Sequence, residues 1–252
     1  MNPEIIALIP ARAGSKRVKS KNIRLLQGHP LLAYTISAAA ESGIFSAVVV
    51  STDSEEIATI ARHYGAEVPF LRPTQYAGDL SPDIEWVEYT LRALAAQGRS
   101  YGCFSILRPT SPFRQAETIK RAWDQFLSRT DFDSLRAVEL CSQHPCKMWV
   151  VINNDQIVPL LPCGPADPPW HSTPYQALPE VYVQNASLEI AWTRVVLERR
   201  TIAGDKIMPF FTEGWEGFDI NDELDWALAE HLVASGKAML PDVEQEAFGG
   251  QR

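Results

Sequence analysis

Continuous runs of aliphatic residues alternate with segments of helical periodicity in the first part of the chain. Residues 5–9 and 47–50 are unbroken apolar runs, which are typical of strands buried on both faces of a parallel sheet. Between them, apolar positions recur at helical spacing from Pro30, a residue type favoured at the start of a helix, to Gly43, a type favoured just after its end. This order predicts a βαβ unit at the beginning of the fold.

The same alternation continues to about residue 130 and returns near the C-terminal end. Asp53 precedes Glu56 by three residues, which predicts a helix with Asp53 as its cap. Ser81 and Pro82 predict the start of another helix. Strands are expected at 67–71, 103–107, 187–192 and 207–211, and a last helix at 222–235. We therefore expect an α/β fold with a mostly parallel sheet flanked by helices.

Eight prolines break this rhythm between about residues 140 and 184 and leave only short strand-like pieces such as 147–152. This composition indicates a small lobe at 140–184, inserted into one domain that spans 1–240. Such a length suits a single large α/β domain. The acidic, glycine-containing segment 241–252 is expected to be a flexible tail.

Charge and composition exclude several classes of function. The formal net charge of −8 argues against a nucleic-acid partner, because a polyanion is usually bound by a broad cationic face. No apolar run is long enough to span a bilayer, and 5–10 is too short for a signal-peptide core, so we expect no membrane contact and a cytoplasmic location. Four scattered cysteines indicate reduced thiols. Cys141, His144 and Cys146 could hold zinc, but their spacing matches no paired CxxC pattern, which favours an ordinary loop.

A strongly basic segment directly follows the first predicted strand. Residues 12–24 contain six cations and no acid, and they lie at the carboxyl end of a strand, where open α/β sheets bind ligands. Small residues at 13–15 allow backbone N–H groups to approach phosphate oxygens while the cations neutralise them. The segment matches neither the Walker A loop nor the GxGxxG pattern. A solvated basic loop is the alternative, but the position after a buried strand favours a cradle for a triphosphate.

The basic segment also carries a family signature. The sequence IPARAGSK at 9–16, followed by Lys21 and Asn22, resembles the signature of CMP-sialic acid synthetases. These acylneuraminate cytidylyltransferases have relatives that act on legionaminic, pseudaminic and Kdo-type acids. The resemblance extends over residues 4 to about 233. Further motifs of the family recur in its order at 51–53, 70–73, 107–114 and 218–221.

This resemblance implies a fold, a reaction and an assembly. The fold is expected to be a Rossmann-like nucleotidyltransferase domain. The lobe at 140–184 is expected to form a homodimer and to help close the sugar site of the partner. The implied reaction transfers CMP from CTP to the anomeric hydroxyl of a sialic-acid-like nonulosonic acid, an acidic nine-carbon sugar. It releases pyrophosphate and uses Mg²⁺ as its cofactor.

The resemblance further implies roles for individual residues. Arg72, together with the turn at 77–81, is expected to meet the cytosine and ribose, although a surface cation after a strand is the alternative. His171, Tyr175 and Gln176 in the lobe are expected either to reach the sugar or to satisfy their own turns. The expected catalytic residues are Lys21, Arg12 and Asp219. The nucleotide and sugar are expected to be bound by Ala11, Arg12, Gly14, Ser15, Lys16, Lys21, Asn22, Arg72, Arg108, Thr110, Ser111 and Asn185.

One departure from the family pattern lies just after the predicted strand at 103–107. The family usually has Gln at the position of Arg108, where a cation could instead meet the carboxylate of the sugar. Thr110, Ser111 and Arg114 follow in the same segment, and their hydroxyl and guanidinium groups can offer donors to an anion.

A second departure concerns the metal. The family typically has two aspartates where this chain has Asp219-Ile220-Asn221. Because Mg²⁺ prefers hard oxygen ligands, Asp219 is the main expected ligand and Asn221 a weaker one. Asp222 and Asp225 are substitute ligands, or else they only cap the last helix and support its first turn.

Two other functions are open on these patterns. The same basic loop would serve transfer of a nucleotide to Kdo or to a neutral sugar phosphate. A nucleotide-binding protein without catalysis is the second alternative, because Asn221 replaces an expected carboxylate.

Overall fold

The protein is seen here as a computed structural model, which describes residues 2–249. The chain divides into two compact units, one formed by Met1–Ala137 with Asn185–Arg252 and the other by Val138–Gln184. None of the helices in the described range is long and apolar enough to cross a membrane. The cytoplasmic location stays a prediction.

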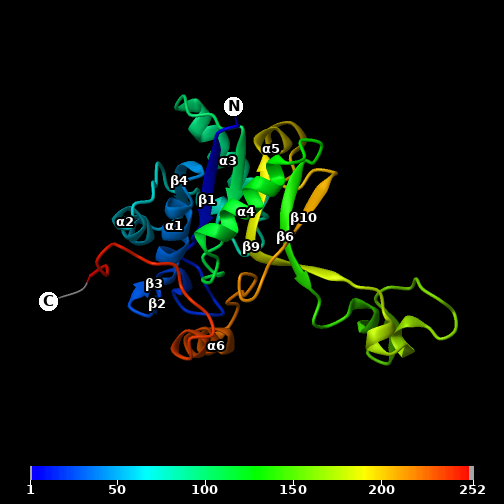
Figure 1. Ribbon diagram of the computed structural model, residues 1–252. Helices are drawn as coiled ribbons and strands as arrows, with labels where there is room; N and C mark the ends of the chain where they lie inside the picture. Colours follow the sequence, from blue (N-terminus) through cyan, green and yellow to red (C-terminus); the bar gives the residue numbers. More distant parts are fainter. Residues whose placement is uncertain (1, 250–252) are drawn as a thin grey trace. The chain divides into compact units, whose positions relative to one another are not determined.

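The larger unit contains a sheet with helices around it (Figure 1). The strands are β1 (Ile5–Pro10), β2 (Leu25–Leu26), β3 (His29–Pro30), β4 (Phe45–Ser51), β5 (Cys103–Ile106), β6 (Ser134–Leu140), β9 (Tyr182–Trp192) and β10 (Ile207–Phe211). The helices are α1 (Leu31–Ser42), α2 (Glu55–His63), α3 (Asp83–Ala96), α4 (Ala116–Leu127), α5 (Thr193–Arg199) and α6 (Glu223–Ala234). Six strands form the main sheet in the order β10-β6-β9-β5-β1-β4. β1 is parallel to β4 and β5, and β5 is antiparallel to β9. The predicted α/β class and mostly parallel central sheet are confirmed.

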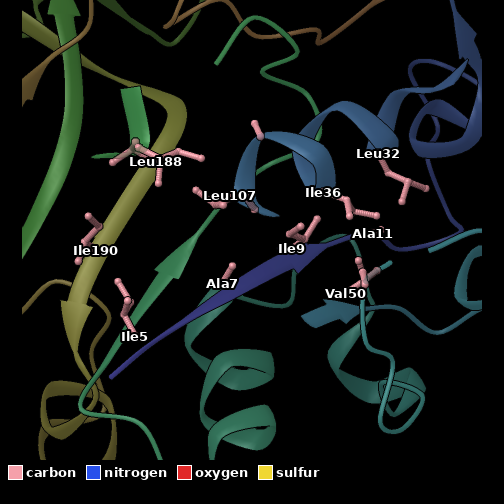
Figure 2. Close-up of a cluster of buried hydrophobic side chains, with 14 of the residues drawn as sticks. Ile5, Ala7, Ile9, Ala11, Leu32, Ile36, Val50, Leu107, Leu188 and Ile190 are labelled. Atoms are coloured by element: carbon pink, nitrogen blue, oxygen red, sulfur yellow. The ribbon is translucent and has the colours of Figure 1, made fainter. Parts of the chain in front are cut away.

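Helices cover both faces of the sheet because successive side chains of β1 enter two different cores. Ile5, Ala7 and Ile9 are buried in a cluster with residues of α1, α2 and α4, part of which is drawn in Figure 2. Ile6 and Leu8 are buried against α3 and α5. Each such aliphatic side chain stabilises the fold by about 1.5–3 kcal/mol. Burial on both faces also explains the unbroken apolar run in the sequence.

The basic segment after β1 packs against the last helix. It contains a short 3-10 helix, Lys21–Ile23, and leads into the β2–β3 hairpin. Val18 and Leu26 are buried in one cluster with Trp226 and Leu232 of α6. This packing holds the segment at the carboxyl end of β1.

The predicted strand at 67–71 is wrong. Only Glu67 pairs, as an isolated parallel bridge with Val49. Pro69 follows, and a proline has no N–H to continue the ladder. In contrast, β9 is longer than predicted, since it begins at Tyr182.

The predicted start of α2 is wrong by one residue. Ser54 caps the helix, and its hydroxyl accepts a hydrogen bond from the backbone of Ile57. The carboxylate of Asp53 instead accepts a hydrogen bond from the backbone N–H of Ala13, at 2.9 Å. The predicted end of α1 is confirmed, because Gly43 adopts a left-handed φ of 66° just past the helix.

The smaller unit contains a two-stranded antiparallel sheet of β7 (Trp149–Ile152) and β8 (Gln156–Pro159). Polar side chains tie its loops together. Lys147 donates hydrogen bonds to two backbone carbonyl oxygens of the same unit, and the hydroxyl of Tyr175 donates to the carbonyl of Ser142. Tyr175 therefore satisfies a turn of its own unit.

The loop that was considered for zinc uses its side chains internally. Nδ1 of His144 accepts a hydrogen bond from the backbone of Cys146, and Nε2 lies 2.8 Å from the carbonyl oxygen of Pro179. The thiol of Cys141 donates to the carbonyl of Gln143. Within residues 2–249, no group of three or more His, Cys, Asp or Glu side chains is arranged to hold a metal ion.

The described part of the C-terminal segment contacts the first two helices. The hydroxyl of Ser37 donates to the carbonyl of Asp242, and the rings of His63 and Phe248 lie 5.3 Å apart. The expected flexibility of 241–252 stays a prediction.

Candidate active site

A cavity of about 240 Å³ opens where β1 and β5 end. Pro10 at the end of β1 lines it, as do Arg108, Pro109 and Thr110 after β5. It therefore occupies the edge of the sheet at which open α/β folds bind ligands. The predicted site residues that line it are Arg12, Ser15, Lys21, Asn22, Arg72, Arg108 and Thr110. Those outside its lining are Ala11, Gly14, Lys16, Ser111, Asn185, Asp219 and Asn221.

A single carboxylate bridges two cations of the basic segment. Nη1 of Arg12 lies 2.6 Å from Oδ1 of Asp79, and the ammonium of Lys16 pairs with the other carboxylate oxygen. Hydrogen bonds from Lys16 and Arg12 hold the pKa of Asp79 below its usual range. Asp79 thus occupies the position of an anion between the two cations.

The backbone of the basic segment is partly committed to internal hydrogen bonds. The N–H of Ala13 donates to Asp53, and the N–H of Ser15 donates to the carbonyl of Ala13 at 2.9 Å. The amide of Asn22 donates to the carbonyl of Arg12 at 3.1 Å. Open space surrounds the Cα of Gly14, where an added Cβ would meet nothing within 4 Å. Close backbone approach of a phosphate is therefore most accessible at Gly14.

Lys21 connects the basic segment to the segment before α6. Its Nζ donates to the carbonyl oxygen of Ile220 at 2.7 Å. Burial lowers the pKa of Lys21, and the negative charge of Asp219 partly offsets this effect. Lys21 is thus a half-buried ammonium that lines the cavity beside a carboxylate.

Asp219 has one committed oxygen and one uncommitted oxygen. Its Oδ2 accepts a hydrogen bond from Nδ2 of Asn221 at 2.7 Å. Its Oδ1 is buried and has no hydrogen-bond partner among residues 2–249. Burying a carboxylate oxygen without a hydrogen-bond donor destabilises the fold, so a bound cation or another donor at this atom would stabilise it.

Asp222 and Asp225 form the start of α6. Oδ1 of Asp222 accepts hydrogen bonds from the backbone of Leu224 and Asp225 at 2.9 and 3.0 Å. The carboxylate of Asp225 accepts from the backbone of Asn221 at 2.7 Å. The interpretation of these two acids as a helix cap and first-turn support is confirmed.

Arg72 is buried, so its interpretation as a surface cation is wrong. Its side chain donates to the hydroxyl and the carbonyl oxygen of Ser51, at 3.0 and 2.8 Å. Its guanidinium lies over the ring of Trp86, 4.7 Å from the centroid. Burial lowers the pKa of Arg72 to about 10. The site therefore contains a positive charge that is oriented by an aromatic ring rather than by an acid.

Arg108 is held by two acids. Its Nη2 lies 2.5 Å from Oδ2 of Asp83 and 3.2 Å from Oε1 of Glu189. Burial would lower the pKa of Arg108, but these two charges outweigh it and raise the pKa. Burial would likewise raise the pKa of Asp83, and Arg108 reverses this shift. The pair is ionised across the physiological range.

Arg114 does not offer donors to an external anion, and that expectation is wrong. The side chain is 1% exposed and donates to the carbonyl of Ser187 and the hydroxyl of Thr35. Ser111 is equally buried and lies outside the cavity lining. Asn185 donates to the hydroxyl of Thr212 at 2.9 Å.

A known family matches this chain. The model of a family described as Cytidylyltransferase matches residues 6–155, which is more than half of the chain. The chain belongs to the cytidylyltransferase family. The cytidylyltransferase is 35% identical over 230 residues to a CMP-N,N'-diacetyllegionaminic acid synthase of Legionella pneumophila, covering 91% of this chain and 96% of that protein. It is 30% identical over 235 residues to an N-acylneuraminate cytidylyltransferase of Escherichia coli O18:K1:H7, covering 91% of this chain and 52% of that protein.

Solved structures share the fold of this cytidylyltransferase. A CMP:2-keto-3-deoxy-manno-octonic acid synthetase complexed with CTP matches with a TM-score of 0.66 at 12% identity, covering 92% of this chain and 99% of that one. A 4-diphosphocytidyl-2C-methyl-D-erythritol synthase of Anaerococcus prevotii matches with a TM-score of 0.61 at 12% identity, covering 92% and 98%. The predicted Rossmann-like nucleotidyltransferase fold is confirmed.

Several residues of the cytidylyltransferase site were not singled out by sequence patterns. Trp86 lies in the helix that Ser81 and Pro82 were predicted to start, yet it also lies under Arg72. Asp83 and Glu189 form ion pairs with Arg108. Asp79, which was predicted only as part of the turn at 77–81, forms an ion pair with Arg12. The excess of cations after β1 was a signal that acids elsewhere must approach them.

The residues around Asp219 fit a magnesium ion. The ion prefers oxygen ligands and is usually held by one or two carboxylates plus waters and substrate phosphates. The buried Oδ1 of Asp219, which lacks a donor, suits such a ligand. The amide of Asn221 is directed at Oδ2 of Asp219 and holds that carboxylate in place. A ligand role for Asn221 stays a prediction.

Proposed function

We propose that this cytidylyltransferase transfers CMP from CTP to the anomeric hydroxyl of a sialic-acid-like nonulosonic acid and releases pyrophosphate. The observation that carries the proposal is the convergence of Arg12, Lys21 and Arg72 on one cavity at the carboxyl edge of the sheet. Three cations suit a triphosphate. The choice of acceptor is supported by the names of the relatives, which include synthases of CMP-activated legionaminic acid and N-acylneuraminate cytidylyltransferase.

In the proposed reaction, the anomeric oxygen of the sugar attacks the α-phosphorus of CTP. The bond from that phosphorus to the bridging oxygen of pyrophosphate breaks as the new bond forms, and the proton of the attacking hydroxyl passes to solvent. Arg12, Lys16 and Lys21 bind the phosphates and stabilise the charge that develops on pyrophosphate. Alignment and electrostatics supply the acceleration, since phosphoryl transfer needs little covalent chemistry from a protein.

Magnesium is the proposed cofactor, with Asp219 as its main ligand and Asn221 as the weaker one. When bound, Mg²⁺ would polarise phosphate oxygens and offset their charge. Lys21 lies beside Asp219, so its ammonium also limits the negative charge at this edge of the cavity. Ala11, Gly14, Ser15, Asn22, Thr110, Ser111 and Asn185 stay predicted nucleotide and sugar contacts.

A substrate panel tests this function. Pyrophosphate release is measured with CTP or UTP and with legionaminic, sialic, pseudaminic and Kdo acids in turn, with and without Mg²⁺. The proposal expects turnover with CTP and a nine-carbon acid only. Turnover with Kdo or with a neutral sugar phosphate would assign another acceptor class, and CTP binding without any turnover would indicate a protein without catalysis.

Asp79→Asn is expected to tighten CTP binding by about fivefold, because the exposed ion pairs of Asp79 must break before phosphates reach Arg12 and Lys16. Calorimetry with CTP measures the change. The matched control is Asp205→Asn, which removes an exposed acid that pairs with Arg199 outside the cavity. Weaker binding by Asp79→Asn would mean that this carboxylate supports the nucleotide instead of competing with it.

We also propose that the smaller unit forms the homodimer contact. Every residue of β7 is exposed, including Trp149, Val151 and Ile152. Exposed apolar patches of this kind usually mark an interface. Val151→Glu is expected to convert a dimer into a monomer in sedimentation experiments. The control is Leu224→Glu, at a 78% exposed position on α6; dimers that persist in Val151→Glu would contradict the assignment.

A further inference from the structure

Within the described part of the chain, the guanidinium of Arg108 has one of its three nitrogens bound to protein. Both acids that hold it, Asp83 and Glu189, contact Nη2. Nε and Nη1 have no hydrogen-bond partner among residues 2–249, and neither is among the buried unsatisfied atoms. Because Arg108 lines the cavity, these N–H groups are open to a ligand there.

The two acids that pair with Arg108, Asp83 and Glu189, each contact a further side chain. Oδ1 of Asp83 accepts a hydrogen bond from the indole N–H of Trp86 at 2.7 Å. Glu189 is 6% exposed, and its Oε2 lies 2.8 Å from Nη1 of Arg136. The guanidinium is therefore fixed before a ligand arrives, which reduces the entropy that binding must offset.

The guanidinium groups at this wall of the cavity differ in how closely acids approach them. Asp83 and Glu189 balance Arg108 and Arg136. Arg72 adds a further buried guanidinium with no acid in ion-pair distance within the described residues. Asp53 and Asp83 offset the charge of Arg72 only from beyond ion-pair distance, so an anionic ligand group at this wall would add a stabilising interaction that a neutral group would not.

We propose that Arg108 binds the carboxylate of the acceptor sugar and thereby selects acids over neutral sugars. This rests on the proposed function, because it assumes an acidic acceptor. Either Nε–H or Nη1–H, which lie on different edges of the guanidinium, donates to the carboxylate while Nη2 stays with Asp83 and Glu189. Charge-assisted hydrogen bonds of this kind are about twice as strong as neutral ones. Arg108 is a specificity-determining residue in this assignment, and the basic segment retains the phosphates.

Two substitutions separate this role from a merely structural one. Arg108→Gln removes the charge and leaves two acids uncompensated, so it could also weaken the fold. Arg108→Lys keeps a charge for Asp83 and Glu189, but its single nitrogen is then used by those acids and has little to offer the cavity. Both variants are therefore expected to lose the carboxylate contact, and only the first endangers stability.

The experiment is a double-mutant cycle between protein and substrate. The kcat/KM of each enzyme is measured for the acid acceptor that the panel identifies and for its primary amide, which has the same shape without the charge. Wild type is expected to prefer the acid by about 30-fold or more, and both variants are expected to reduce this preference at least about tenfold with KM for CTP within about twofold. Arg92→Gln, a surface arginine on α3 that pairs with Glu88, is the matched control and should keep the full preference.

The outcomes are distinct. An undiminished preference for the acid in Arg108→Lys and Arg108→Gln overturns the inference while leaving the proposed function intact. Equal losses for acid and amide also overturn it, because the contact is then not with the carboxylate. If wild type activates none of the acids although it binds CTP, the proposed function fails, and the inference fails with it.

Discussion

Lys21→Ala is expected to slow pyrophosphate release by about 10²- to 10³-fold, equivalent to about 2.7–4 kcal/mol of transition-state stabilisation, by analogy with the removal of one oxyanion donor. The half-buried ammonium lines the cavity and is oriented by the carbonyl of Ile220 at 2.7 Å. In that position its charge interacts more strongly with the developing negative charge than the charge of an exposed lysine would. Single-turnover measurements at saturating CTP and acceptor give the rate.

Lys19→Ala is the matched control for this prediction. Lys19 is an exposed cation two residues earlier in the same segment and does not line the cavity. Its removal should change the rate by less than about threefold, because exposed charges are well screened. Equal effects of the two substitutions would mean that the general charge of the segment matters and not the placement of Lys21.

The pH dependence should follow from the same residue. Burial lowers the pKa of Lys21 from its ordinary value of 10.5, and only the protonated amine carries the stabilising charge. The rate of wild type should therefore fall as pH rises through this lowered pKa. Lys21→Ala should lack that alkaline decrease, and a persistent decrease in the variant would assign it to another group.

The sequence was most informative where local pattern and chain direction decide the structure. A strand buried on both faces has an unbroken apolar run, and the residues after it must lie at the carboxyl edge of the sheet. These two facts predicted both β1 and the placement of Arg12 and Lys21 at a cavity on that edge. They follow from neighbours in the chain, so no tertiary information was needed.

Contacts between distant segments could not be predicted in this way. Asp79 reaches Arg12 across 67 residues, and Glu189 reaches Arg108 across 81. Arg72 illustrates a further limit, since a charged residue after a strand is usually exposed, yet Trp86 and Ser51 bury this one. The departure from Gln at Arg108 becomes intelligible only beside Asp83, an acid that the sequence placed merely at the start of a helix.

Asp219→Asn is expected to lower the rate by about 10²- to 10³-fold and to shift its dependence on Mg²⁺ to higher concentration. The substitution keeps the size of the side chain but removes its negative charge. A neutral amide is a weaker ligand for Mg²⁺ than the carboxylate whose Oδ1 is buried without a hydrogen-bond donor. Asp219 forms no ion pair with another residue of 2–249, and only its longer-range attraction to Lys21 is lost, so the melting temperature should change little. Titrating Mg²⁺ at saturating CTP separates lost metal binding, which raises the half-saturating concentration, from lost turnover at full occupancy.

Asp222→Asn is the control, because this neighbouring acid caps α6 through the backbone of Leu224 and Asp225. An amide at this position still accepts a hydrogen bond, so the expected cost is at most about 1 kcal/mol of stability with an unchanged Mg²⁺ response. If Asp222→Asn shifted the Mg²⁺ titration and Asp219→Asn did not, the metal would lie at the helix cap. The orphaned oxygen of Asp219 would then need a different partner, and the amide of Asn221 would no longer be holding a metal ligand in place.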